Sequence, residues 1–147
     1  MSLTLFVSRW MHPDYPPLPV TDEALGAVEA HFRFLFPDDY REAVQRIGLV
    51  SPTIDLLDAI VDRELDMADL SKLLDPAEMV ASTDAWRDMG LPGDMVAFGT
   101  DCSGNLFCFR TAGGSAIFYF DHDFRTTREI APSFTKWIEA FCALGED

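Results

Sequence analysis

Three short apolar runs between Met95 and Asp123, separated by tight turn sequences, constrain the fold of this chain more than any other feature. The runs are Met95–Phe98, Leu106–Phe109 and Ala116–Phe120, and they are rich in residues that favour β-strands. The first intervening segment supplies Asp, Ser, Gly and Asn, and the second contains a Gly-Gly pair, as is typical of turns between paired strands. We therefore expect an antiparallel meander here.

The N-terminal third is expected to begin with an extended lead-in over residues 1–20. Residues 12–19 are rich in proline, which excludes a helix interior, and Leu3–Val7 suits a short edge strand or an ordered tail. An amphipathic helix is predicted over residues 22–35, after an N-cap threonine. A second helix is predicted from Pro37 to a stop at Gly48.

The rest of the chain adds further helices around the strands. Residues 52–57 suit a short strand, and residues 58–74 suit one helix or a loop with a helical turn. Asp75 is expected to cap another helix, and the apolar spacing from Phe134 to Leu144 predicts a last helix that packs on a sheet face. This order predicts an α+β fold in one domain over residues 1–147, with helices on one face or end of the sheet.

Composition narrows the possible partners. The 147 residues carry a formal net charge of −14, which disfavours binding to nucleic acid phosphates or to anionic membranes. No stretch approaches the roughly 20 apolar residues of a membrane helix, and the N-terminus lacks the features of a secretory signal. We expect a cytoplasmic protein whose three cysteines are reduced.

Half of the net charge lies in one middle segment. From Asp55 to Asp88 there are ten acidic residues against three basic ones, a net charge of −7. Such clustering can attract a basic partner, although a solvated helix face is the plainer interpretation. The acidic residues we assign to partner binding here are Asp55, Asp58, Asp62, Glu64, Asp66 and Asp69.

The end of the third apolar run is the second candidate for partner binding. Phe118 and Phe120, followed by Asp121 and Asp123, suit an apolar hot spot rimmed by acids, or else a sheet that is covered on both faces. His122 lies between the two acids, yet nothing in the sequence places metal ligands or a catalytic partner beside it. We therefore expect no catalytic residue, metal or cofactor.

Several motifs together are similar to those of a known family. They are Leu35–Tyr40, which reads Leu-Phe-Pro-Asp-Asp-Tyr, then Phe98–Asp101, Gly104–Phe109, Ile117–Asp123 and Ala131–Ile138. In this order and spacing they resemble SMI1/KNR4 domains of the SUKH superfamily.

The resemblance implies a bent antiparallel sheet flanked by helices. It also implies that many bacterial members are immunity proteins, which bind and neutralise a toxin domain that is often a nuclease or deaminase, whereas eukaryotic members are regulatory interaction proteins. Our hypothesis is a non-enzymatic immunity-type protein that occludes a basic toxin domain through an acidic and aromatic surface. The alternatives are a regulatory interaction scaffold of the same fold, and a small hydrolase that uses His122 with Asp121, Asp123 or Cys102. The sequence leaves the oligomeric state open.

Overall fold

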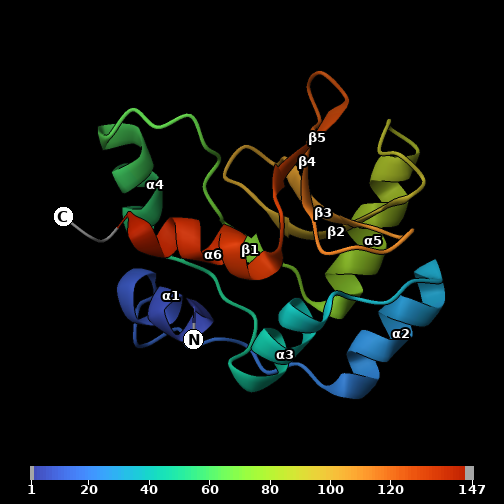
Figure 1. Ribbon diagram of the computed structural model, residues 1–147, viewed down its shortest axis with the longest axis horizontal. Coiled ribbons are helices and arrows are strands. Elements are labelled where there is room, and N and C mark those ends of the chain that lie inside the picture. The colour runs from blue at the N-terminus through green and yellow to red at the C-terminus, as the bar shows by residue number, and fades with distance from the viewer. Residues whose placement is uncertain (1, 145–147) are drawn as a thin grey trace.

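The computed structural model describes residues 2–144 and is shown in Figure 1. Within that range the helices are α1 Ser2–Trp10, α2 Asp22–Phe32, α3 Asp38–Arg46, α4 Ile54–Asp62, α5 Pro76–Arg87 and α6 Phe134–Ala143. The strands are β1 Lys72–Leu73, β2 Met95–Thr100, β3 Leu106–Arg110, β4 Ile117–Asp121 and β5 Thr126–Ala131. The predicted α+β fold is therefore confirmed.

The strands form one antiparallel sheet in the order β1-β2-β3-β4-β5, so each strand pairs with its neighbour in sequence. This arrangement confirms the meander that the three apolar runs predict. The sequence pattern does not predict β5, because four of its six residues, Thr126–Glu129, are polar and the strand lies at the edge of the sheet with most side chains partly or fully exposed.

Helices cover both faces of this sheet, which corrects the expectation of helices on one face or end (Figure 1). On one face, Phe98 of β2 and Phe107 of β3 contact Trp137 of α6, with ring centroids 5.5 and 4.7 Å apart. On the other face, the Phe120 ring of β4 packs against the Trp86 ring of α5, with ring centroids 6.2 Å apart. Helices α1 and α3 pack beside α6, and α2 packs beside α5.

The N-terminal segment is a helix, not the extended strand or tail that we expected. Leu3, Phe6 and Trp10 are buried at helical spacing, and the Phe6 ring packs against Phe141 of α6 at 6.1 Å. The short strand expected over residues 52–57 is also absent, because α4 already begins at Ile54. A two-fold alternation cannot be distinguished from a helical one over so few residues.

The predicted helix caps are largely confirmed. Thr21 accepts a hydrogen bond from the Ala24 amide at 3.1 Å, and Asp75 forms a capping box with Glu78. Helix α2 ends at Phe32, shorter than expected, because Arg33 adopts a left-handed backbone conformation. Among residues 2–144, no helix combines the length and the apolar character needed to cross a bilayer.

Candidate protein-binding surface

Helix α4 presents to solvent a face that is both acidic and aliphatic. Asp55, Asp58 and Asp62 follow one another at i, i+3 and i+7 spacing, and all three are exposed. Ile54 and Val61, two turns apart on the same side of the helix, are 65% and 62% exposed. Figure 1 places α4 at one end of the molecule, far from α5.

The opposite side of α4 attaches the helix to the core. Leu56 and Ile60 are buried there, one turn apart. At the start of the helix, the Thr53 amide and hydroxyl both donate to the carbonyl of Trp10, at 2.7 and 3.1 Å. The helix is therefore anchored along one side, and its other side is left uncovered by the described residues.

The segment after α4 turns away from the helix at Glu64, whose φ is +53°, and carries further exposed side chains. Glu64 and Asp66 are exposed, and Leu65 is 39% exposed. We call the combined set the α4 surface, which consists of Ile54, Asp55, Asp58, Val61, Asp62, Glu64, Leu65 and Asp66. Asp69 does not belong to it, which corrects the expectation from sequence: its side chain is buried and accepts a hydrogen bond from the Cys102 amide at 3.1 Å.

The expectation of an exposed aromatic hot spot at Phe118 and Phe120 is wrong. Both side chains are buried on the sheet face that α5 covers, while Tyr119 between them faces the α6 side with Phe107. The sheet is thus covered on both faces, the plainer of the two interpretations. The Arg110 guanidinium lies over the Phe118 ring at 4.2 Å and closes the remaining gap.

The turn between β4 and β5 exposes a different aromatic residue. Asp121 accepts hydrogen bonds from the amides of Asp123 and Phe124, at 2.9 and 3.3 Å, and so holds the turn in place. Phe124 is 78% exposed and Asp123 is exposed beside it. The sequence offers one signal for Phe124, namely an aromatic residue within an otherwise polar turn.

The two predicted acidic regions are not brought into one patch. The β4–β5 turn lies against α5, because the His122 ring is 5.5 Å from the Trp86 ring, and α4 lies at the other end of the molecule (Figure 1). Of the predicted partner-binding residues, the structure therefore groups Asp55, Asp58, Asp62, Glu64 and Asp66, and separates them from Asp121 and Asp123.

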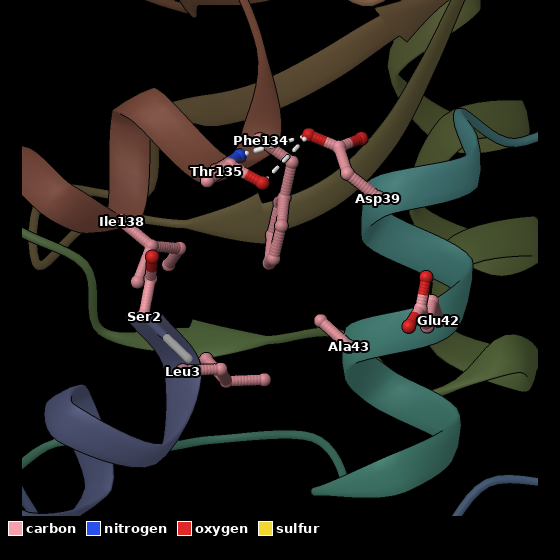
Figure 2. Close-up of a pocket in the computed structure, with 8 residues that line it drawn as sticks. All are labelled: Ser2, Leu3, Asp39, Glu42, Ala43, Phe134, Thr135 and Ile138. Atoms are coloured by element: carbon pink, nitrogen blue, oxygen red, sulfur yellow. Dashed lines mark hydrogen bonds between the residues drawn. The ribbon is translucent and has the colours of Figure 1, made fainter.

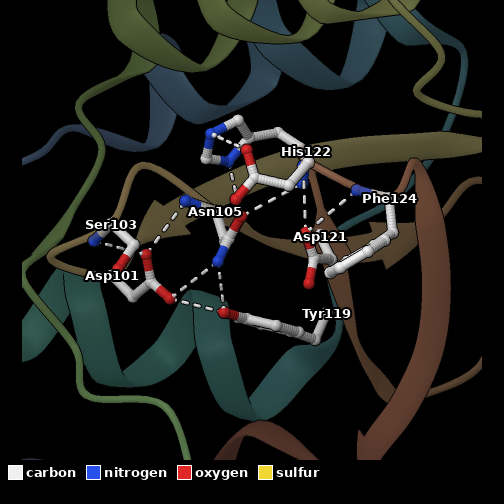
Figure 3. A network of polar contacts seen from close by, with 8 residues as sticks. Asp101, Ser103, Asn105, Tyr119, Asp121, His122 and Phe124 are labelled. Carbon is white, nitrogen blue, oxygen red and sulfur yellow. Dashed lines mark hydrogen bonds and ion pairs between the residues drawn. The ribbon is translucent and has the colours of Figure 1, made fainter.

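A hydrogen-bonded network joins the β2–β3 and β4–β5 turns (Figure 3). One oxygen of Asp101 accepts from the amides of Ser103 and Asn105, both at 2.9 Å. Its other oxygen accepts from the Tyr119 hydroxyl at 2.5 Å, and the Asn105 amide nitrogen donates to that hydroxyl at 2.6 Å. The side-chain oxygen of Asn105 accepts from the His122 backbone amide at 3.0 Å. These bonds fix the two turns. The His122 ring adds contacts from Nδ1 to the Asn105 side-chain oxygen at 2.5 Å and from Nε2 to the Asp123 carboxylate at 3.3 Å.

The Cys102 side chain is a poor nucleophile in this setting. Partial burial and the neighbouring Asp69 carboxylate raise the pKa of the Cys102 thiol, so the thiolate is disfavoured at neutral pH. Its side chain contacts the Ser103 hydroxyl at 3.8 Å, and Ser103 has no basic character. Among the described residues, no group of three or more His, Cys, Asp or Glu side chains is arranged to hold a metal ion.

A small hollow lies between the start of α1, helix α3 and the start of α6 (Figure 2). Its volume is about 260 Å³ and most of its wall is apolar. The Asp39 carboxylate at its rim accepts hydrogen bonds from the Thr135 amide and hydroxyl, at 2.9 and 3.1 Å, and from the Tyr40 amide at 2.9 Å. Asp39 thus joins α3 to α6, and this structural role accounts for its position.

The α4 surface combines negative charge with exposed apolar area. A face with carboxylates beside exposed aliphatic side chains can attract a basic partner over a distance and then bury apolar area on contact.

Comparison with known proteins agrees with the fold. None of the curated proteins compared with the chain matches it. The family model described as SMI1 / KNR4 family (SUKH-1) matches residues 19–140, a span that runs from just before α2 into α6. The chain therefore belongs to the SMI1/KNR4 family (SUKH-1).

Proposed function

We propose that this chain is an immunity-type protein that binds a toxin domain in the cytoplasm and neutralises it by occlusion, without catalysing a reaction. Membership of the SMI1/KNR4 family is compatible with this role. The observation that carries the proposal is the α4 surface, where five exposed carboxylates and three exposed aliphatic side chains occur within α4 and the four residues that follow it.

The partner proposed is a basic toxin domain of the nuclease or deaminase class. An enzyme that acts on nucleic acid needs a cationic surface to hold the phosphates of its substrate. A ridge of carboxylates can occupy such a surface, and the net charge of −14 would speed the encounter at low salt. Occlusion of the substrate channel then suffices for neutralisation.

Affinity capture followed by a rescue assay tests the proposal. The intact chain is used as bait in extracts of its source cells, at low and at high salt, and the captured proteins are identified by mass spectrometry. We expect a basic toxin domain that is lost as salt rises, that arrests growth when expressed alone, and that is tolerated when the chain is expressed with it. A captured protein that shows no toxicity would contradict the proposal.

A charge-matched pair of variants locates the surface. The triple variant Asp55→Asn, Asp58→Asn, Asp62→Asn removes three carboxylates from the α4 surface, and we expect it to lose both capture and rescue. The control removes the same charge at exposed positions elsewhere, and its substitutions are Glu23→Gln, Asp88→Asn and Glu129→Gln. Equal loss in both variants would show that net charge, not the α4 surface, governs the interaction.

The same experiment addresses the alternative of a regulatory interaction scaffold. Capture of a housekeeping protein that persists at high salt, in cells that express no toxin, would favour that alternative. Screening by salt distinguishes the two, because exposed charge pairs weaken with ionic strength and apolar contacts do not.

A further inference from the structure

The aliphatic residues of the α4 surface have a spacing that is specific to helix packing. Ile54 and Val61 are exposed at i and i+7 of the helix, and Leu57, which is half-buried, lies between them at i+3. This is the spacing of the apolar seam between two packed helices. Along α4, no other helix among residues 2–144 covers this seam, because the Ile54 and Val61 side chains remain 65% and 62% exposed.

Exposed aliphatic residues occur elsewhere, but they do not form such a ridge. Leu35 is 79% exposed just before α3, and Leu18 is 61% exposed in the proline-rich segment. A single exposed residue such as Leu35 is normal on protein surfaces, whereas Leu18 lines an apolar hollow beside Tyr15 and does not belong to a helix. Two along one side of a single nine-residue helix, with a third half-buried in line, require a different explanation.

The charges beside the ridge identify its occupant. From residue 54 to residue 66 there are five carboxylates against one guanidinium, that of Arg63. Two copies of α4 packed together would oppose carboxylates to carboxylates, which disfavours a homodimer through this face. An anionic lipid surface is disfavoured for the same reason. A helix with basic residues beside its own apolar seam complements both features.

We propose that the α4 ridge docks a basic amphipathic helix of the partner, with apolar residues at 3–4 residue spacing and Lys or Arg on the flanks. This inference rests on the proposed function and specifies the partner element that the α4 surface receives. A helix of nine residues cannot alone supply the roughly 800 Å² per partner of a stable interface. The ridge is therefore the centre of a larger contact, and the exposed Glu64 and Asp66 extend its rim.

A synthetic peptide tests the ridge without any toxin. The probe is a fluorescent three-heptad helix with Leu at a and d and Lys at e and g. The control peptide has the same composition in scrambled order, so its charge is equal and its seam is lost. We expect the full chain to bind the helix about ten-fold more tightly than the scrambled peptide in fluorescence anisotropy, because only the ordered seam can bury the ridge.

Variants of the chain separate apolar docking from charge attraction. Ile54→Gln with Val61→Gln keeps every charge and a good helix former, and it should abolish the ten-fold preference for the ordered peptide. Leu35→Gln is the matched control, an equally polar change at an exposed residue off the ridge, and it should keep the preference. Far-UV circular dichroism establishes that each variant is folded.

Each outcome bears on the inference. An unchanged preference in the Ile54→Gln, Val61→Gln variant, or NMR shift changes that the ordered peptide induces away from α4, would overturn it. So would equal affinity of the wild-type chain for both peptides. The toxin hypothesis fails separately, in the capture and rescue assay, because the peptide measurement needs no toxin.

Discussion

Tyr40→Phe and Tyr119→Phe remove the same atom from two tyrosines and should change stability in opposite directions. The Tyr40 hydroxyl is fully buried, and it has no hydrogen-bond partner within residues 2–144. Its ring lies among aromatic side chains, such as Phe109 at 5.0 Å between centroids. The Tyr119 hydroxyl, by contrast, donates to Asp101 and accepts from Asn105.

The magnitudes follow from these environments. A buried hydroxyl without a partner costs about 1–3 kcal/mol. Its removal from Tyr40 forfeits a few dispersion contacts of about 0.1–0.2 kcal/mol each, so we expect the free energy of unfolding to rise by about 1 kcal/mol. A hydrogen bond to a charged carboxylate is worth about 1.5–3 kcal/mol, so Tyr119→Phe should lower the same quantity by about 2 kcal/mol.

Urea denaturation followed by circular dichroism measures both changes, with thermal unfolding as a second readout. For a domain of this length, about 3 °C in Tm corresponds to 1 kcal/mol, so we expect shifts of about +3 °C for Tyr40→Phe and −6 °C for Tyr119→Phe. An unchanged m-value shows that the denatured state is unaffected. Destabilisation of the chain by Tyr40→Phe would refute the reasoning, because it would mean that the Tyr40 hydroxyl is satisfied in solution.

Three further changes test other parts of the fold. Gly48→Ala should lower the free energy of unfolding by about 2 kcal/mol or more in urea denaturation, because Gly48 has φ +115° and a Cβ there would lie 2.8 Å from a backbone oxygen. Gly93→Ala is the control: the space around Gly93 is open, so this change should leave stability nearly unaltered. Burial raises the pKa of the Cys108 thiol, so a thiol reagent should modify exposed Cys102 in the native chain and Cys108 only after unfolding. Burial disfavours the ionised form of the Glu78 carboxyl, but hydrogen bonds from Lys72 and from the backbone amide of Asp75 favour that form more strongly. The pKa of Glu78 is therefore lowered from its usual 4.5. The stability that it contributes is therefore lost as pH falls below about 4.5, and Glu78→Gln should flatten the acid limb of a stability–pH curve.

The meander is predictable because its local signals agree. In β2, β3 and β4 the β-prone runs are bounded by turn residues, and Asp101 bonds to the amides that close the β2–β3 turn. Strand β5 lies at the edge of the sheet and is mostly polar, so it has no apolar run from which a strand could be predicted. Likewise, α1 has only three buried residues, and its helical spacing becomes visible only once α6 is known to lie beside it.

Burial of the second sheet face depends on a contact that the local sequence does not encode. The two-residue period of a strand establishes that Phe118 and Phe120 point away from Tyr119. Whether that side faces solvent depends on α5, which lies some thirty residues earlier in the chain and covers it with Trp86. Asp69 illustrates the same limit: in the sequence it is one of ten acidic residues between Asp55 and Asp88, yet it is buried and accepts a long-range hydrogen bond from the Cys102 amide.

The candidate surface can be predicted in part, for a physical reason that concerns α4 itself. Its folding role and its proposed binding role fall on different sides of one helix, with Leu56 and Ile60 on the buried side and Asp55, Asp58 and Val61 on the exposed side. Charge is additive along a sequence, so composition alone locates the acidic half of the surface. The aliphatic half can be located only if the segment is known to be a helix. The acidic residues at its start make that helix hard to recognise from the sequence. Because the buried side suffices to attach α4, the exposed side can be changed with little effect on stability, and a substitution there reports on recognition alone.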